Sequence, residues 1–559
     1  RNFLCVLPPV SDMVRARNPE LFPTWKSDDW QRNGEGVRAS TSRDVTIELD
    51  LETPGTDVSK VTVAPLAAKA IHAPNDGTLA SSFVINTGEG LVWTMGWSPV
   101  NGDTDTSLLA VGCHPPGSSD SLHELTELCT KKDAVIQIWK VRGMGSDAKV
   151  EPLVNVLHEG GVTWSVCWCP SPRAAEGRLG LLAAVLGDGS VCVWDIPDLP
   201  NNNPSKDGVL TCRVAPVAEL PPDHVDGSIP CTVDWLPHAP HDLLLVGYRD
   251  GCVSIVDLTD GNSPGERMRV KQYFPAEALT LTAARWFPAP ASATKADRDG
   301  DGDRDKDRDG DRAAERRIFV TCGHESVVNV WDARLEYTPR LSIKTMCAYT
   351  IQDMTFTTSP LGIALALEDS SVRGLLMGAD AIEPQLKSGR PLSMITFRGA
   401  LLGSLWAVDA GAPSNLSPES QQSVAYAGED GIIGIMGNAS YPYLAKKRKD
   451  ADRALLRLEV SGDSESAFRL SSGGKIASGT LYVDKSKSSK DRADKDTIPN
   501  AAHTIYSMRW SKECAGCQGR GQWLAYGNAS GIVHIVWVKP PDDAELTEDD
   551  TAADDDDDG

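Results

Sequence analysis

The chain has 559 residues, a formal net charge of −23, 15 tryptophans and 13 cysteines. This length suffices for a large core or several domains, and the acidic balance excludes a domain that holds nucleic acid by bulk positive charge alone. No apolar run approaches the ~18 residues that a membrane-spanning helix needs, so no membrane partner is expected. The odd number of scattered cysteines, with no secretory signal ahead of them, favours reduced thiols in the cytosol or nucleus. The sequence begins at Arg1 rather than Met, which is consistent with a fragment of a longer protein.

Residues 1–80 are expected to form an N-terminal segment ahead of a larger domain. Within this segment, DVTIELDL (44–51) and KVTVAPL (60–66) are rich in β-branched residues and alternate between apolar and polar positions. The pattern predicts two strands. Both are candidates to pair with a strand that lies far away in the sequence.

From residue 81 onward a short motif recurs. Each copy has one tryptophan near its end and is followed by an apolar run, a tight polar turn and a second β-branched run, as in TWSVCWCP, LGLLAAVL, GDGS and VCVWDI. The recurring tryptophans are Trp97, Trp168, Trp235, Trp286 and Trp510. Two weaker copies, at 351–377 and 401–437, keep the rhythm with eroded signature residues and bring the count to seven. Each copy therefore predicts a unit of short strands joined by a hairpin turn.

Seven such units predict an all-β, seven-bladed β-propeller spanning residues 81–540, because each small sheet packs on its neighbours around a central channel. The dipeptides Trp194–Asp195 and Trp331–Asp332 resemble the signature of WD40 repeats. In the second unit, His158, Asp188 and Trp194 match the positions at which WD40 blades link a loop His, a turn Asp and a strand Trp by hydrogen bonds. We therefore interpret His158 as a structural residue rather than a catalytic one.

Two pairs of cysteines raise the question of a metal site. Cys167 and Cys169 lie in the stretch GGVTWSVCWCPSP (160–172), whose period-two alternation predicts a core strand. A C-x-C pair without nearby His or Cys partners disfavours zinc. Cys514 and Cys517 form a single C-x-x-C, which we interpret as part of a surface loop. The sequence predicts no metal site and no cofactor.

Two insertions, at about 290–317 and 440–500, are predicted to be disordered because they are rich in charged and small polar residues. The first resembles a calcium-binding loop, but Arg308 occupies the position where that loop needs a bidentate Glu. The second opens with a basic cluster, which is a candidate nuclear-import signal or phosphate contact, or else a solvated loop. This cluster consists of Lys446, Lys447, Arg448 and Lys449.

Residues 541–559 form an acidic tail, which is predicted to be disordered because like charges repel and few apolar residues are available for burial. The strand before it, IVHIVWV, runs into KPPDDAELTEDD, whose prolines and charges disfavour an outer strand. A last blade without that strand would leave an open sheet edge. We expect an N-terminal strand to complete this blade, and we favour 60–66 over 44–51 because it lies closer to the first blade.

No enzyme motif stands out, since the sequence has no Gly-rich phosphate loop, no H-E-x-x-H and no G-x-S-x-G elbow. A propeller offers two rigid faces and a rim of loops, which favours a non-catalytic interaction scaffold. Two alternatives stay open. A chromatin- or histone-binding propeller would direct its acidic tail at basic partners, and an enzyme would gather acid and base side chains in the channel.

Residues 88–258 resemble the WD40-repeat subunit of general transcription factor IIIC. The segments that carry the similarity follow one another in order: GEGLVWTMGWSP, LLAVGCHPPGSSDS with its H-P-P insertion, AVIQIWKV, HEGGVTWSVCWCP, RLGLLAAVLGDGSVCVWDIP and VDWLPHAPHDLLLVGYRDGCVSIVDL. The resemblance implies a nuclear, non-enzymatic subunit of the complex that recognises internal promoters of tRNA genes for RNA polymerase III. It implies the other subunits of that complex as partners, especially the large promoter-binding subunit, with indirect or weak contact to DNA.

Overall fold

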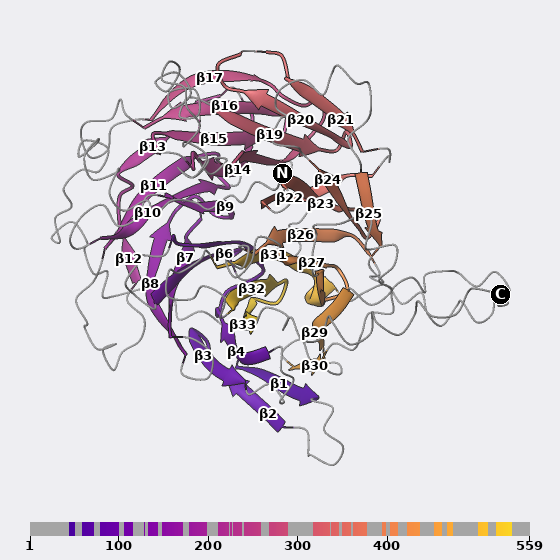
Figure 1. Cartoon of the computed structure of the whole chain (residues 1–559). Helices are drawn as coiled ribbons and strands as arrows, with labels where there is room; N and C mark the ends of the chain where they lie inside the picture. The colour runs from indigo at the N-terminus through magenta and orange to yellow at the C-terminus, as the bar shows by residue number, and fades with distance from the viewer. Residues whose placement is uncertain are drawn as a thin grey trace, which may run out of the picture.

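The computed structural model forms seven sheets around a central axis (Figure 1). The described residues are 44–50, 59–71, 79–99, 106–115, 128, 132–143, 148–170, 178–197, 211–222, 224–225, 227–237, 240–258, 268–288, 317–335, 337–345, 349–358, 361–376, 394–398, 403–411, 422–436, 452–460, 467–472, 501–511 and 521–538. The predicted seven-bladed β-propeller is therefore confirmed. No helix in these ranges is long and apolar enough to cross a membrane.

Four strands build each blade, from the channel outward. The inner strands are β5 (Val92–Trp97), β9 (Thr163–Trp168), β14 (Pro230–Trp235), β18 (Leu281–Trp286), β22 (Ile351–Thr358), β26 (Leu405–Ala410) and β31 (Ile505–Trp510). The second strands are β6 (Thr106–Cys113), β10 (Arg178–Leu186), β15 (Leu243–Tyr248), β19 (Ile318–Gly323), β23 (Leu361–Leu367), β27 (Val424–Gly428) and β32 (Gln522–Asn528).

The third and outer strands complete the blades. The third strands are β7 (Ala134–Arg142), β11 (Val191–Pro197), β16 (Cys252–Asp257), β20 (Val327–Asp332), β24 (Ser371–Leu376), β28 (Ile432–Met436) and β33 (Ile532–Val538). The outer strands are β8 (Lys149–His158), β13 (Ala218–Leu220), β17 (Arg269–Pro275), β21 (Leu341–Lys344), β25 (Met394–Arg398), β29 (Asp452–Val460) and β4 (Leu79–Asn86). Blade one gains a further short strand, β12 (Thr211–Arg213), which pairs in parallel with β8.

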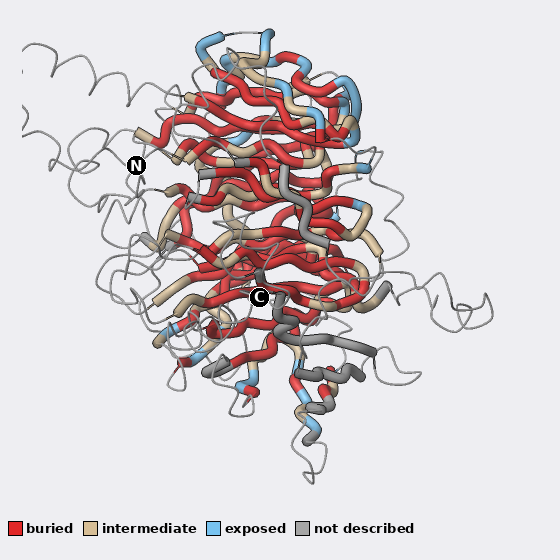
Figure 2. Tube along the Cα trace, turned by 45° about the vertical axis from the view of Figure 1, so that its right-hand side comes forward, coloured by how far each residue is buried: buried red, intermediate tan, exposed pale blue. Residues whose placement is uncertain are grey.

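The hydrophobic core is divided into clusters that lie between neighbouring blades. At the junction of blades seven and one, for example, Phe83 and Ile85 pack with Trp139, Trp523 and Trp537. Figure 2 shows buried residues running through all the blades, with exposed residues gathered at turns and outer edges. Because each blade buries apolar residues on both of its faces, a blade is stabilised by its two neighbours, as in other repeat architectures.

Blade seven is closed by the N-terminal part of the chain, but not by the segment that the sequence favoured. The outer strand is β4, which pairs antiparallel with β33 and is covered on its other edge by β3 (Ala67–Ile71). The prediction that Lys60–Leu66 closes the blade was wrong. Strand β4 lies closer to blade one in the sequence than that segment does. Because β4 is enclosed on both edges, it needs residues that can be buried, and Phe83, Val84 and Ile85 are buried.

Residues 59–63 belong instead to blade six. They form β2 (Ser59–Val63), which pairs with β1 (Val45–Asp50), and β1 pairs in parallel with β30 (Ala467–Ser472). The insertion at 440–500 was predicted to be disordered, and this is wrong for the parts that form β29 and β30, because both strands continue the sheet of blade six. Most of the 290–317 insertion and the acidic tail lie outside the described residues. The boundaries 1–80, 81–540 and 541–559 stay predictions.

Blade four contains a buried polar network of the kind expected for WD40 blades, with a glutamate in place of the loop histidine. Trp331 Nε1 donates to Thr321 Oγ1 (3.0 Å), and that hydroxyl donates to Glu277 Oε1 (2.5 Å). Asn329 Nδ2 also donates to Glu277 Oε1 (3.0 Å). Glu277 is 4% exposed, and burial raises its pKa to about 7 although both hydrogen bonds act in the opposite direction.

Candidate interaction site at the central channel

The inner strands share an irregularity that decides which side chains face the channel. In six of the seven blades the pairing register shifts between the first and third residues of the inner strand, as at Val92/Thr94 in β5, and in blade two it shifts at the equivalent place. Such a β-bulge turns one side chain out of the regular alternation. As a result, the second and fifth residues of these strands face the channel together, although an unbroken strand would place them on opposite sides.

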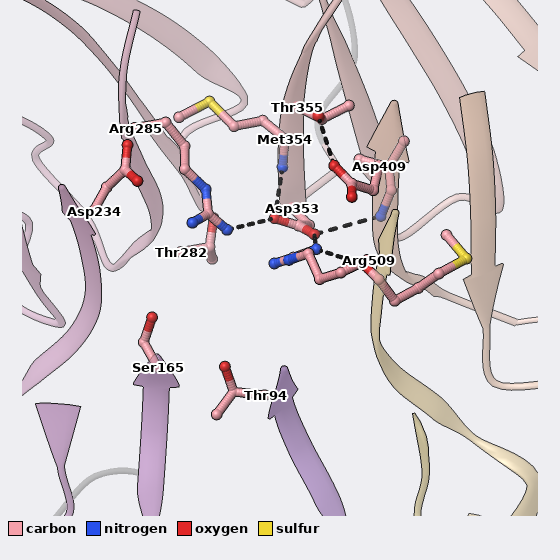
Figure 3. Close-up of polar contacts among 12 residues, drawn as sticks. Thr94, Ser165, Asp234, Thr282, Arg285, Asp353, Met354, Thr355, Asp409 and Arg509 are labelled. Carbon is pink, nitrogen blue, oxygen red and sulfur yellow. Dashed lines mark hydrogen bonds and ion pairs between the residues drawn. The ribbon is translucent and has the colours of Figure 1, made fainter. Parts of the chain in front are cut away.

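The fifth positions form what we call the channel ring. Each member is partly exposed, whereas the residue before it is buried in every blade. The ring consists of Gly96, Cys167, Asp234, Arg285, Thr355, Asp409 and Arg509. Polar and charged side chains from different blades thus meet at one level of the channel (Figure 3).

Asp353 connects four blades at the centre of Figure 3. Its Oδ1 lies 3.6 Å from the Arg285 guanidinium of blade four, and its Oδ2 accepts a hydrogen bond from Arg509 Nη1 of blade seven at 3.0 Å. The same Oδ2 accepts from the backbone N of Val408 in blade six at 3.4 Å. Removing one partner of a buried ion pair typically costs about 3–5 kcal/mol, because the remaining charge is left buried and unpaired, so Asp353 and its two arginines depend on one another.

Two further carboxylates of the channel ring bind the next blade through its backbone. Asp234 Oδ2 accepts from the N of Trp286, and Asp409 Oδ2 accepts from the N of Trp510, both at 2.7 Å. Burial raises the pKa of Asp409, although the nearby Arg509 acts in the opposite direction. Burial alone would lower the pKa of Arg509, but the charges of Asp353 and Asp409 raise it overall. These acid and base groups therefore join different blades.

The second positions of the inner strands supply an aromatic cluster, defined as Trp93, Trp164, Trp406 and Tyr506. The Trp93 ring stacks on Tyr506 with centroids 5.1 Å apart, and it meets Trp406 of blade six at 6.4 Å. These contacts join blades six, seven, one and two, which follow one another around the ring, so the cluster lines one side of the channel. Trp93, Trp406 and Tyr506 are partly exposed, whereas Trp164 is buried.

The aromatic cluster lies near one particular face of the propeller. In every blade the residue that follows the second strand donates its backbone N–H to the residue that precedes the inner strand, as His114 does to Leu91 and Glu429 to Ser404. These hydrogen bonds gather the loops before the inner strands and the turns between second and third strands on one side, which we call the entry face. At this face the Arg249 guanidinium lies 5.6 Å above the Trp164 ring, and His114 stacks on Trp93.

The three residues proposed from the WD40 pattern lie in blade two and its border with blade one, but their hydrogen bonds run to other groups. His158 Nε2 bonds Thr163 Oγ1 at 3.1 Å, and its Nδ1 has no hydrogen-bond partner among the described residues. Trp194 Nε1 donates to the carbonyl of Val214, and Asp188 accepts from Ser190. The rings of His158 and Trp194 lie 6.3 Å apart. Burial lowers the pKa of His158 to about 4, and its structural role stays a proposal.

The sequence reasoning missed the channel ring and the aromatic cluster. Aligning the seven motif copies on their last residue would have brought Asp234, Arg285, Asp409 and Arg509 into one column. The charged residues at the fifth positions could thus be found in the sequence. The bulge that brings the second positions to the same side of the strand could not. The basic cluster Lys446–Lys449 and the pair Cys514 and Cys517 lie outside the described residues.

Comparison with known proteins supports the resemblance stated from the sequence. General transcription factor 3C polypeptide 2 of Homo sapiens is 24% identical over 288 residues, which are 46% of this chain and 28% of the human protein. Transcription factor tau subunit sfc6 of Schizosaccharomyces pombe is 32% identical over 120 residues, which are 22% of this chain and 19% of the yeast protein. The chain thus spans less than a third of either relative.

A third similarity concerns the fold rather than the role. Protein transport protein SEC13-2 of Candida glabrata is 27% identical over 208 residues, which are 37% of this chain and 56% of that protein. No family model matches the chain. Together, the named relatives and the seven blades confirm that the chain resembles the WD40-repeat subunit of general transcription factor IIIC.

Proposed function

We propose that this chain is a non-catalytic scaffold subunit of a nuclear transcription factor complex similar to transcription factor IIIC, which serves RNA polymerase III. In this role it supports promoter recognition at tRNA-type genes through contacts with the other subunits, above all the large promoter-binding subunit. The observation that carries the proposal is its similarity to two transcription factor subunits from distant organisms.

The arrangement of charges in the channel supports a structural role for the charged channel residues. Asp234, Asp353 and Asp409 are each bound to a backbone N–H of the next blade, and Asp353 also pairs with Arg285 and Arg509. A catalytic acid or base needs a pKa suited to its task and free access to substrate. Residues that hold blades together in this way are poorly placed for that work.

Co-purification tests the proposal directly. The full chain, carrying an affinity tag, is expressed in cells of its own source and recovered from nuclear extract, and the co-purifying proteins are identified by mass spectrometry. We expect the large subunits of a transcription factor IIIC-like complex in amounts comparable to the tagged chain. Recovery of histones and histone chaperones without those subunits would instead favour the chromatin-binding alternative.

DNA binding by the isolated chain provides a second readout. The body of the protein is acidic, so we expect weak binding to tRNA-gene promoter DNA that does not distinguish it from a shuffled sequence. The complete complex should show the specificity that the isolated chain lacks. Tight, sequence-specific binding by the chain alone would contradict the scaffold role.

A further inference from the structure

The entry face is strongly acidic. Carboxylates occur in the described turns of six of the seven blades, whereas the Lys and Arg residues in these described turns are Lys132 and Arg249. The carboxylates are Asp133, Glu159, Asp188, Asp250, Glu325, Glu368, Asp369, Glu429 and Asp430. Glu89 and Glu277 also lie on this side, but burial raises the pKa of each to about 7, so they are not counted in its charge. Such a concentration of one sign of charge attracts ligands of the opposite sign and raises their rate of association.

Local ion pairs neutralise part of this charge and leave much of it. Arg213 pairs with Asp133 and Glu159, and Arg373 pairs with Asp369 at 3.2 Å. Even with both arginines counted, the carboxylates of the entry face outnumber its basic residues. The excess runs around the face from Asp133 in blade one to Glu429 in blade six, so a partner that follows this path would meet carboxylates in each of these blades.

The aromatic cluster gives the acidic face a centre that favours cations. The faces of Trp and Tyr rings attract ammonium and guanidinium groups, and the attraction is stronger where these groups are desolvated. The cluster already holds one such group, because the guanidinium of Arg249 lies over Trp164. The partly exposed rings of Trp93, Trp406 and Tyr506 offer further ring surface beside it.

Large apolar side chains are also exposed on this face. Leu279 is 54% exposed in the loop before β18, and Tyr349 is 48% exposed in the loop before β22 of the neighbouring blade. Leu128, in the connection between β6 and β7, is 41% exposed. Exposed apolar residues beside acidic turns suit a ligand that carries both basic and apolar side chains, because apolar contact adds affinity that charge attraction alone does not provide.

We propose that the entry face binds an extended segment of a partner protein that is rich in Lys and Arg and contains apolar residues, with one basic side chain seated on Trp93, Trp406 and Tyr506. This inference deepens the proposed function, on which it rests, by assigning the partner-binding face and the chemistry of the partner segment. The backbone hydrogen bonds that join the loop before each inner strand to the turn after the second strand hold the entry face in place before a partner binds. Binding therefore costs this face little conformational entropy.

Fluorescence anisotropy with the full chain tests this inference. The probe is a short labelled peptide of alternating Arg, Lys and Leu residues, and its counterpart carries Glu in place of Arg and Lys. We expect the basic peptide to bind and the acidic peptide not to bind. Raising NaCl from about 50 mM to about 300 mM should weaken binding at least several-fold, because exposed charges are screened over shorter distances.

Two sets of variants locate the site. Trp406→Ala should weaken peptide binding about 3- to 10-fold and Trp406→Phe less, because Phe keeps a ring face. The combined variant Glu325→Gln, Glu368→Gln and Glu429→Gln should weaken binding at low salt and flatten its salt dependence. Matched controls lie away from the entry face: Tyr337→Ala, at an aromatic residue that is 66% exposed after β20, and Glu151→Gln on outer strand β8.

The outcomes are distinct. Equal loss of binding in control and entry-face variants, or none in either, would overturn the inference. Unfolding caused by Trp406→Ala would show as a lowered melting temperature. In that case the combined glutamine variant tests the inference, through its peptide affinity at low salt. Replacement of Lys446–Lys449 by alanine tests whether the chain covers its own entry face: a several-fold gain in peptide affinity would overturn the assignment to a separate partner.

Failure of this inference can be told apart from failure of the proposed function. If the tagged Trp406→Ala and glutamine variants still recover the transcription factor subunits in full, the partners bind elsewhere and the proposed function stands. If the unaltered chain recovers none of those subunits but binds the basic peptide in the manner described, the entry face is a binding site and the proposed function fails.

Discussion

Blades four and seven have similar inner strands but are completed in different ways. In blade four the outer strand β21 follows β20 after a short connection and forms the edge of the sheet, with Ser342 and Lys344 exposed. In blade seven the outer strand β4 comes from the other end of the chain and lies between β33 and β3. Phe83, Val84 and Ile85 of β4 are consequently buried.

The difference shows where the ring is vulnerable. Strand β21 covers the sheet edge of one blade, whereas β4 joins the two ends of the propeller. Strand β4 also contributes to the hydrophobic cores on both faces of blade seven, through Val84 on one face and Phe83 and Ile85 on the other. Thr87, at the end of β4, also donates from its hydroxyl to the carbonyl of Gly531 at 2.7 Å. Closure is therefore a long-range contact on which neighbouring blades depend.

The largest effect is expected from deleting residues 1–87, which removes β4 and leaves β33 paired on one edge only, with β32. Such a variant should lose its cooperative thermal unfolding transition, as followed by circular dichroism, because an open edge and two incomplete cores remain. Deleting residues 1–70 retains β4 and should be milder. Removal of residues 542–558 is the matched control and should change the melting temperature by less than about 2 °C. A cooperative transition in the 1–87 deletion at the temperature of the intact chain would refute this account of closure.

Single substitutions sharpen the same contrast. Ile85→Ala in β4 should cost about 2–5 kcal/mol of unfolding free energy, since Ile85 is fully buried. Ile343→Ala in β21 removes the same atoms from a partly buried site and should cost about 1 kcal/mol. Urea unfolding of both variants measures the difference. Equal costs would mean that the two outer strands are equivalent, contrary to the structure.

A smaller effect concerns pH, to which the two blades should respond in opposite directions. The pKa of Glu277 in blade four is raised to about 7, so its contribution to stability falls as pH rises from about 4.5 to about 7. The pKa of His534 in blade seven, which bonds the hydroxyl of Tyr526, is lowered by burial to about 3. Its contribution falls as pH drops from about 6.5 toward 3.

Glu277→Gln tests the blade-four half of this prediction. The amide keeps an oxygen for Thr321 and Asn329 but cannot ionise, so the variant should be about 1–3 kcal/mol more stable than the intact chain at about pH 8 and nearly equal at about pH 5. His534→Asn is the counterpart in blade seven. Because asparagine takes up no proton, this variant should lose less stability than the intact chain as pH drops below about 6.5. Melting temperatures across this pH range give the answer. Parallel profiles for Glu277→Gln and the unaltered chain would show that Glu277 does not titrate as described.

Much of the fold could be predicted from the sequence because the repeated motif specifies the same local structure several times. The recurring motif before Trp97, Trp168 and Trp235 fixed the place of the inner strands, and the apolar runs after it fixed the next two. The need for an N-terminal strand also followed from the prolines after β33. The choice among candidate strands failed because β-branched alternation at 60–66 fits any half-buried strand, and it does not say which sheet edge the strand will meet.

The candidate site was less accessible to sequence reasoning. Charged residues before the recurring Trp could be seen in Asp234, Arg285 and Arg509. Asp353, which pairs with both arginines, lies two positions earlier in its own strand and meets them only across blades. The loop histidine of blade four is replaced by Glu277, which the pattern did not mark. Such replacements preserve hydrogen bonding while changing the residue type, so a signature of fixed letters does not find them.

By itself, the sequence determined the seven strand units, the resemblance to a transcription factor subunit and the acidic balance of the chain, because these follow from local periodicity and composition. Only the tertiary structure decided which N-terminal strand closes the ring and which side chains meet in the channel. Both depend on contacts between residues far apart in the chain, such as Ile85 with Val533 and Asp353 with Arg509. A bulge of one residue in each inner strand brings the aromatic cluster to the channel, and local alternation gives no sign of it.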